Sequence, residues 1–262
     1  MVRATTLLLF FSLHSLAGDN LITIQTQGTG TTITASQAGS SNTTGIYCGL
    51  GSFDNSLVSN HTCDGATITV DVTGDSNVTY SQSVWSNHDD QTWITTVTGN
   101  SNYSVIDMDE SGSTSRITQD GDDHQAWILG SGVDNVYKIE QSGESQYGKI
   151  ISFGDDGDIW ITQEGSGDHN AYVYNSGSAH NNSTRLIQKG SGNKDADVFW
   201  YADDGDLTLT QQGNGSHTSN IKFYTDDYDV TVVQKGTTNK SYSATFNCSS
   251  NCTKTITIMQ EN

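Results

Sequence analysis

Apolar and polar residues alternate with a period of two in short segments along most of the chain. In one such segment Ile159, Ile161 and Gln163 fall on the same face. Trp160 and Thr162 fall on the opposite face. This period predicts β-strands with one buried and one solvent-facing side. No helical period appears beyond the first residues.

The strand pattern recurs with a Gln near its end and a Gly two residues later. Successive glutamines are 22, 22, 25, 23 and 23 residues apart, and a last strand repeats the Gln without the Gly. Upstream, Val72 and Val97 keep the register but replace the Gln. The glutamines are Gln119, Gln141, Gln163, Gln188, Gln211, Gln234 and Gln260. The glycines, which we expect to form turns, are Gly121, Gly143, Gly165, Gly190, Gly213 and Gly236.

A second strand begins a few residues after each Gln and directs a small and then a larger apolar residue inward. Ala126 with Ile128 and Ala171 with Val173 are examples. One repeat of about 22–25 residues is therefore strand, turn, strand, turn. A single repeat cannot cover its apolar face, whereas stacked repeats bury a continuous core. The sequence predicts an all-β protein, a β-solenoid with two strands per rung.

The repeated glutamines fall on the predicted inward face. A buried amide without partners is costly, but amides stacked at the spacing of the rungs can hydrogen-bond to one another as an Asn/Gln ladder. Such a ladder would also fix the register, because a slip of one residue turns the Gln outward. The alternative is that Gln serves only as a polar residue at the strand end.

The N-terminus has the pattern of an export signal. Arg3 precedes the apolar run Leu7–Phe11, and small residues near Ala17 suit a signal peptidase. A hydrophobic N-terminal strand is the alternative. We expect a signal peptide at 1–18, an N-terminal repeat at 19–40, a cysteine-containing insertion at 41–66 and stacked repeats at 67–262. No stretch is apolar enough for a membrane span.

The net charge of the chain argues against some classes of binding partner. The chain carries 30 acidic and 11 basic residues, a formal net charge of −19. Such a chain repels nucleic acid and anionic lipid. It has no Pro but 5 Trp, 11 Tyr and 7 Phe, a composition unlike that of disordered chains. The acidity would keep a β-prone chain soluble until it assembles.

The four cysteines form two local pairs. In an exported protein an even number suggests disulfides, and of the three possible connectivities we favour Cys48–Cys63 with Cys248–Cys252. A metal site that uses His61 and Cys63 is the alternative, but CxxC spacing is missing.

Acidic turns suggest a calcium site, and no motif suggests catalysis. The carboxylates recur in turn after turn, and known catalytic motifs are missing, so we expect neither an enzyme nor a cofactor. We expect these turns to stack in register on neighbouring rungs, where their carboxylates could hold Ca²⁺, or they could form a solvated acidic edge. The calcium candidates are Asp155, Asp156, Asp158, Asp203, Asp204 and Asp206.

Aromatic residues at outward positions suggest a binding stripe. They are Trp127, Trp160, Tyr172 and Phe199. A stripe for sugars or surfaces, lateral packing between fibres and simple stiffening of the sheet all remain open.

The repeat resembles that of the curlin family. That unit runs Ser, five residues, Gln, one residue, Gly, two residues, Asn, one residue, Ala, one residue, Val. The segment from Gln119 through Gly121, His124 and Ala126 to Ile128 is similar to it, with His in place of Asn. Asn193 and Asn239 retain the Asn itself in later repeats. The resemblance covers roughly residues 67–262.

The resemblance implies a secreted subunit of curli-like amyloid fibres that serve adhesion and the biofilm matrix. It also implies an outer-membrane secretion channel and a nucleating subunit as partners, besides other copies of the chain. We expect the last strand, Thr255–Gln260, to dock onto Leu21–Gln37 of the next copy, since unpaired strand edges template new strands. The competing hypothesis is a monomeric or capped solenoid adhesin, with or without calcium.

Overall fold

All twenty elements of the computed structural model are strands. It describes residues 20–26, 31–48, 65–83, 91–99, 101–109, 114–121, 123–154, 157–176, 182–201, 204–224, 226–236, 239–247 and 254–261. The even-numbered strands are β2 (Thr32–Ala38), β4 (Thr67–Thr73), β6 (Thr92–Thr98), β8 (Thr114–Gly121), β10 (Val136–Gly143), β12 (Asp158–Glu164), β14 (Asn182–Lys189), β16 (Gly205–Gln212), β18 (Tyr228–Lys235) and β20 (Lys254–Glu261). The odd-numbered strands are β1 (Asn20–Thr26), β3 (Asn42–Cys48), β5 (Thr79–Ser83), β7 (Tyr103–Asp109), β9 (Gln125–Ser131), β11 (Gln146–Ser152), β13 (His169–Asn175), β15 (Lys194–Trp200), β17 (His217–Phe223) and β19 (Lys240–Phe246).

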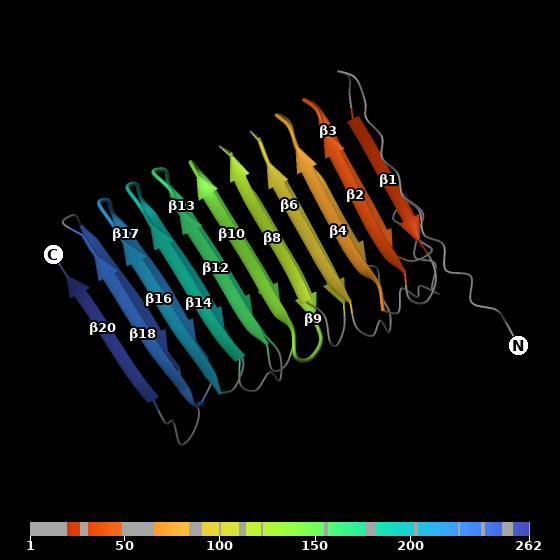
Figure 1. Ribbon diagram of the computed structural model, residues 1–262. Coiled ribbons are helices and arrows are strands. Elements are labelled where there is room, and N and C mark those ends of the chain that lie inside the picture. The colour runs from red at the N-terminus through yellow and green to blue at the C-terminus, as the bar shows by residue number, and fades with distance from the viewer. Residues whose placement is uncertain are drawn as a thin grey trace, which may run out of the picture.

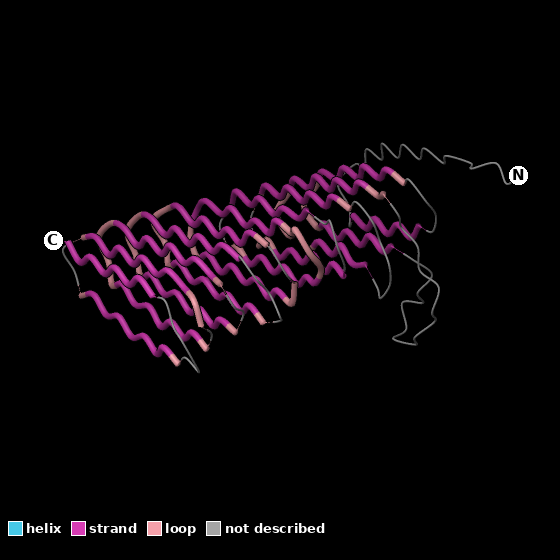
Figure 2. Tube along the Cα trace, turned by 90° about the horizontal axis from the view of Figure 1, so that it is seen from below, coloured by secondary structure: helices cyan, strands magenta, loops and turns pink. Residues whose placement is uncertain are grey.

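The strands form two parallel sheets of ten strands each. One sheet contains the even-numbered and the other the odd-numbered strands, each in chain order. The chain thus alternates between the sheets and advances by one rung every 23 residues or so. Figure 1 shows the even sheet in front, coloured in chain order from one end of the stack to the other. Figure 2 shows the strands in two layers. The predicted β-solenoid with two strands per rung is confirmed.

The core lies between the two sheets and is built from columns of like residues. Ile117, Ile139 and Ile161 pair in register on neighbouring strands and are fully buried. In the odd sheet Ile128 and Ile150 form a facing column, again with no exposed surface. Alternation along each strand keeps this column structure in register, because a slip of one residue would expose the whole face.

The predicted insertion at 41–66 contains a regular strand. β3 pairs with β1 on one side and with β5 on the other, so its residues belong to the odd sheet. Ile46 in its middle is fully buried. An inward Thr44 and Ile46 continue the alternation of the repeat here, although the Gln-x-Gly pattern is weak in this part of the chain.

The ends of the stack expose strand edges. Within the described ranges, no strand pairs with the outer edge of β1 and β2 at one end or of β19 and β20 at the other. The expected signal peptide at 1–18 lies outside the described residues. Among the residues that are described, no helix has the length and apolarity to cross a bilayer.

Candidate functional site

The repeated glutamines form one continuous hydrogen-bonded column inside the solenoid. Each Nε2 donates to Oε1 of the Gln one rung nearer the N-terminus. The distances are 3.0 Å for Gln141 to Gln119, 3.0 Å for Gln163 to Gln141, 2.9 Å for Gln188 to Gln163, 3.0 Å for Gln211 to Gln188, 2.9 Å for Gln234 to Gln211 and 2.9 Å for Gln260 to Gln234. All except Gln260 are at most 2 % exposed. The column is the amide ladder that the spacing predicted.

From Gln119 to Gln234, the second N–H of each ladder amide joins the two sheets. Gln163 Nε2 also donates to the Asn170 carbonyl at 2.7 Å, and Gln188 Nε2 to the Asp195 carbonyl at 2.8 Å. These acceptors belong to the strand that follows in the same rung. Each of these glutamines therefore links its rung to the previous one and also links the two strands of its own rung. Both functions need a side chain with two N–H groups and an acceptor, which Gln supplies.

The column extends beyond the ladder toward the N-terminus. Gln37 pairs with Val72, Val72 with Val97 and Val97 with Gln119, so all occupy one column. Gln37 is 5 % exposed and accepts a 2.6 Å hydrogen bond from Thr44 Oγ1. The two valines separate this first Gln from the other seven.

The turn glycines form a second column in which successive backbones touch. A Cβ on Gly190 would overlap the carbonyl oxygen of Gly165, and one on Gly165 would overlap that of Gly143. Gly190 and Gly165 also have φ angles of +108° and +147°, which disfavour other residues. The sequence predicted the turns, but close contact between neighbouring rungs is a further reason for Gly at this position.

A third column of buried polar residues lines the start of the odd strands. Asn77 Nδ2 donates to Asn42 Oδ1 at 2.8 Å, and Asn102 Nδ2 donates to Asn77 Oδ1 at 2.7 Å. Later rungs place titratable or longer side chains in the same register. The members, in order, are Asn42, Asn77, Asn102, His124, Gln146, His169, Lys194, His217 and Lys240.

The third column differs at two positions from the match to the curlin repeat. Asn193 and Asn239 matched the repeat's Asn by spacing, yet both are exposed. Their C-terminal neighbours Lys194 and Lys240 occupy the column instead, because the turn is one residue longer. Lys194 Nζ donates to the Gly192 carbonyl at 3.0 Å. The period of two, extended backward from Ala196, would have indicated Lys194.

Three ionisable side chains of the third column have shifted pKa values. Burial, with the charges of Lys194 and Lys240 added, lowers the pKa of His217 to about 4. Burial also lowers the pKa of His169, and Lys194 acts in the same direction. The pKa of Lys194 itself is lowered by burial, although Asp168 opposes the shift. Cationic side chains one rung apart thus disfavour protonation of the histidines between them.

The acidic turns differ from the predicted calcium arrangement. Asp158 pairs with Ser183, and Ser183 pairs with Asp206, so the two aspartates are two rungs apart. The prediction that they lie on neighbouring rungs is wrong, because β14 contributes a rung that starts without an Asp. Asp155, Asp156 and Asp203 lie outside the described residues. Among the described residues, no group of three or more His, Cys, Asp or Glu is arranged to hold a metal ion.

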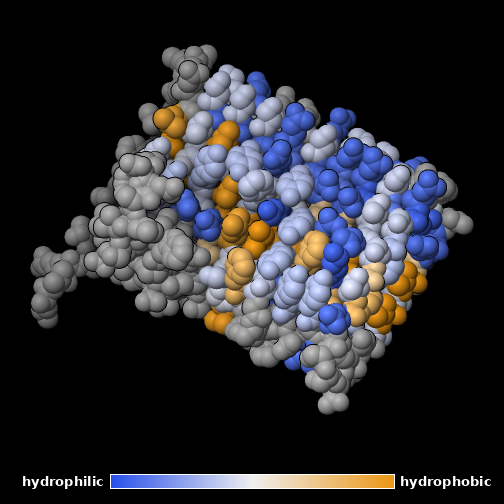
Figure 3. Space-filling view, turned by 180° about the vertical axis from the view of Figure 1, so that it is seen from behind, coloured by the Kyte–Doolittle hydropathy of each residue, from blue (hydrophilic) through white to orange (hydrophobic). Residues whose placement is uncertain are grey.

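The outward aromatic residues do not form the single stripe that the sequence suggested. Trp127, Tyr172 and Phe199 lie on the odd sheet, whereas Trp160 lies on the even sheet. On the odd face, Lys149 Nζ lies 5.3 Å from the Trp127 ring and 5.4 Å from the Tyr172 ring. Figure 3 shows this face, with hydrophobic groups among hydrophilic ones. The rings stack mainly on one another and on lysines.

The predicted disulfides fall on parts of the chain that are not described. Cys63, Cys248 and Cys252 lie outside the described residues, and of Cys48 only the backbone is described.

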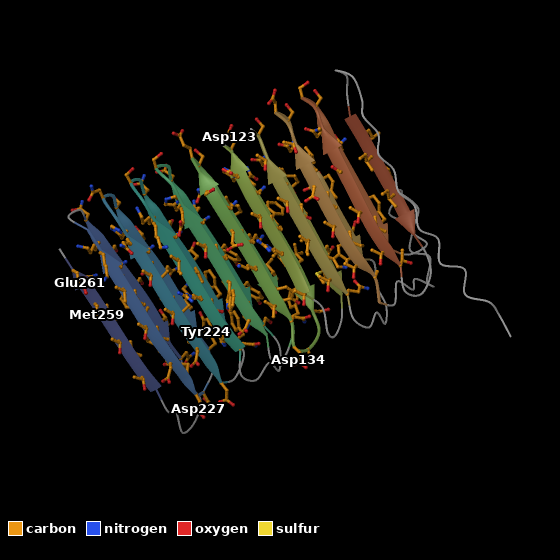
Figure 4. All side chains as sticks on the ribbon, in the orientation of Figure 1. Asp123, Asp134, Tyr224, Asp227, Met259 and Glu261 are labelled. Carbon is orange, nitrogen blue, oxygen red and sulfur yellow. The ribbon has the colours of Figure 1, made fainter. Side chains whose placement is uncertain are left out.

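The C-terminal edge presents the core columns to solvent. Ile256, Ile258 and Gln260 continue the columns of Val230, Val232 and Gln234. Ile256 is 39 % exposed and Ile258 is 44 % exposed, although both occupy inward positions. Figure 4 shows Met259 and Glu261 on this last strand at the end of the stack. Within the described residues no strand pairs with the outer edge of β20, and exposed edges of this kind can pair with a further strand.

Comparison with known proteins gives no relative from which a function could be transferred: no family model matches the chain, and neither a curated protein nor a solved structure is similar to it.

Proposed function

We propose that this chain is a secreted structural subunit that polymerises end to end into curli-like fibres for adhesion and a biofilm matrix. The observation that supports this proposal is that, among the described strands, both ends of the solenoid have strand edges without a partner. Each end consists of half a rung, and the halves belong to opposite sheets.

The half rungs follow from the strand order. β20 extends the even sheet beyond β19, and no described odd strand faces it. At the other end β1 extends the odd sheet beyond β3, with Ile24 packed against the core, and no described even strand lies beyond β2. When two copies stack, β1 of the second copy pairs with β19 of the first and completes the rung of β20. β2 of the second copy then pairs with β20.

This stacking continues the core columns across the joint. Ile33 of the second copy comes into register with Ile256 of the first, and Gln37 with Gln260. The exposed apolar side chains of β20 become covered, which favours association by about 25 cal/mol per Å² of apolar surface buried. A joint made from two complete β-strand pairings also satisfies the backbone groups of four strand edges.

Gln37 is suited to extend the ladder between molecules. Within the ladder each Gln from Gln141 to Gln260 donates to the preceding Gln, so Gln260 offers Oε1 to the next rung. Gln37 Nε2 has a 3.4 Å contact with the Thr43 carbonyl and carries a second N–H. That N–H would reach Gln260 Oε1 of the preceding copy. The separation of Gln37 from the ladder by two valines is then explained by its position at the joint.

Export and partners belong to the same proposal. The N-terminal pattern supports secretion, and the resemblance to the curlin repeat supports an outer-membrane channel and a nucleating subunit. The net charge of −19 would slow unwanted association before assembly. We assign no catalytic function and no cofactor.

The test is incubation of the purified chain at neutral pH, with and without sonicated preformed fibres. We expect thioflavin-positive fibres, a lag that the seeds remove, and a cross-β reflection at about 4.7–4.8 Å. A chain that stays monomeric with seeds present would favour the capped adhesin instead.

A further inference from the structure

Two exposed tyrosines lie face to face directly after neighbouring strands of the odd sheet. Tyr201 follows β15, and Tyr224, which is labelled in Figure 4, follows β17. The Tyr224 amide donates to the Trp200 carbonyl at 2.9 Å, so the strand pairing continues into this pair. The ring centroids are 4.6 Å apart and the ring planes differ by 3°. Tyr201 is 41 % exposed and Tyr224 is 39 % exposed.

The two phenol groups also interact with each other. Partial burial raises the pKa of Tyr201, and the charge of Tyr224 and a hydrogen bond between the two hydroxyls raise it further. The hydroxyls therefore lie at the same end of the stacked rings. This arrangement brings the ring carbons beside the two hydroxyls close together.

Other tyrosine pairs in the described ranges are less favourable. Tyr80 and Tyr103 have centroids 5.8 Å apart with ring planes at 77°. Tyr174 and Tyr201 are 5.5 Å apart at 44°. Among the ring pairs of the described residues, only Tyr201 and Tyr224 combine a short distance, parallel planes and exposure of both rings.

We propose that Tyr201 and Tyr224 are a site of oxidative crosslinking, at which a peroxidase using hydrogen peroxide joins them as dityrosine. Each phenol loses one electron and one proton to the oxidant, and the two phenoxyl radicals combine through the ring carbons next to the hydroxyls. The ring hydrogens at these carbons then move to the phenol oxygens, which restores both aromatic rings. One peroxide takes up the two electrons and two protons and becomes two water molecules.

The fold favours this coupling within one chain. The strand pairing holds the rings together before oxidation, which gives the second radical a high effective concentration. The product is a carbon–carbon bond between adjacent rungs that closes the segment 201–224. It would stiffen the odd sheet near the C-terminal end whether or not the chain forms fibres.

The experiment treats dilute, monomeric chain with peroxidase and hydrogen peroxide, followed by denaturation and trypsin. Cleavage after Lys194, Lys222 and Lys235 yields peptides 195–222 and 223–235, the first of which contains Tyr201 as its only tyrosine. We expect dityrosine fluorescence and a linked peptide with two hydrogens fewer than the sum of its parts. Tyr201→Phe and Tyr224→Phe should each abolish this linked peptide, since Phe keeps the ring but not the phenol.

Tyr80→Phe is the matched control, and it should leave the linked peptide unchanged. Circular dichroism checks that all three variants are folded. The proposal is overturned if dityrosine forms only at other positions or not at all. It is also overturned if the linked peptide persists in Tyr224→Phe, or if it occurs only in covalent dimers.

Discussion

Gln163 Nε2 donates to Gln141 Oε1 across 3.0 Å, and both side chains are buried. Each interior glutamine of the ladder donates to the preceding glutamine and accepts from the next, so its removal takes a hydrogen bond from two others. The ladder therefore stabilises the fold and fixes the register of neighbouring rungs.

Substitution Gln163→Val should lower the free energy of unfolding by about 2–4 kcal/mol. Gln141 loses a donor, Gln188 loses an acceptor and the Asn170 carbonyl loses its partner, and each buried unsatisfied group costs about 1–3 kcal/mol. Urea unfolding of the monomer measures the effect. Thr162→Val on the outward face is the control, with a change within about 0.5 kcal/mol. Equal effects of the two substitutions would show that the ladder does not stabilise the fold.

Substitution Gly190→Ala should destabilise the chain by about 3 kcal/mol or more. A positive φ unsuited to Ala costs about 1–3 kcal/mol, and the overlap with the Gly165 carbonyl adds to it. Gly148→Ala is the matched control, because Ala126 and Ala171 occupy the same column on the neighbouring strands. Thermal unfolding compares them. A Gly190→Ala chain as stable as Gly148→Ala would contradict the rung-to-rung contact.

Acid should weaken the fold through the third column. The unfolded chain protonates His217 near pH 6.5, but the folded chain does so only near pH 4. Between these values the folded state binds fewer protons, so the free energy of unfolding falls as the pH decreases. Above about pH 6.5 the titration of His217 does not reduce the free energy of unfolding. Near pH 4 the reduction reaches about 3 kcal/mol.

His217→Asn separates this effect from the titration of the carboxylates. Asn occupies the same column at Asn42, Asn77 and Asn102, so the substitution suits the site. Urea unfolding at a series of pH values should give a shallower slope for the variant between pH 6.5 and pH 4. Identical slopes would mean that His217 is protonated as easily in the folded chain as in the unfolded one.

Ile258→Lys should strongly slow fibre growth with little effect on the monomer. The side chain is 44 % exposed in the single chain but would be covered at the joint, where an unpaired charge is costly. Thr257→Lys places the same charge on the outward face of the same strand and should leave growth unchanged. Seeded thioflavin kinetics compare the two. Growth of Ile258→Lys at the rate of Thr257→Lys would remove this edge as the docking surface.

The repeat period was sufficient to predict the solenoid, the inward glutamines and the turns, because each depends on local alternation and on Gly in a turn. The register of Val72 and Val97 with the glutamines was also predicted correctly. These features recur in most rungs, so a single sequence shows each of them several times.

Features that depend on turn length or on contacts between rungs were missed. Lys194 occupies the buried column although Asn193 matches the repeat by spacing, because one extra turn residue shifts the register of the following strand. The sequence suggests that Asp158 and Asp206 lie on adjacent rungs, but β14 lies between them and has Ser183 at this position. The stacking of Tyr201 on Tyr224 requires knowledge of which strands are neighbours, and neither residue lies in the repeated motif.

The most direct test of end-to-end assembly is the axial rise per subunit in a cryo-EM helical reconstruction of the fibre. Each copy contributes ten strands to each sheet, so a continuous stack at about 4.8 Å per strand predicts a rise of about 48 Å. The Gln260 and Gln37 side chains should lie within hydrogen-bonding distance at every joint. A much shorter rise, or a joint formed by strands other than β19 and β20 with β1 and β2, would contradict the account.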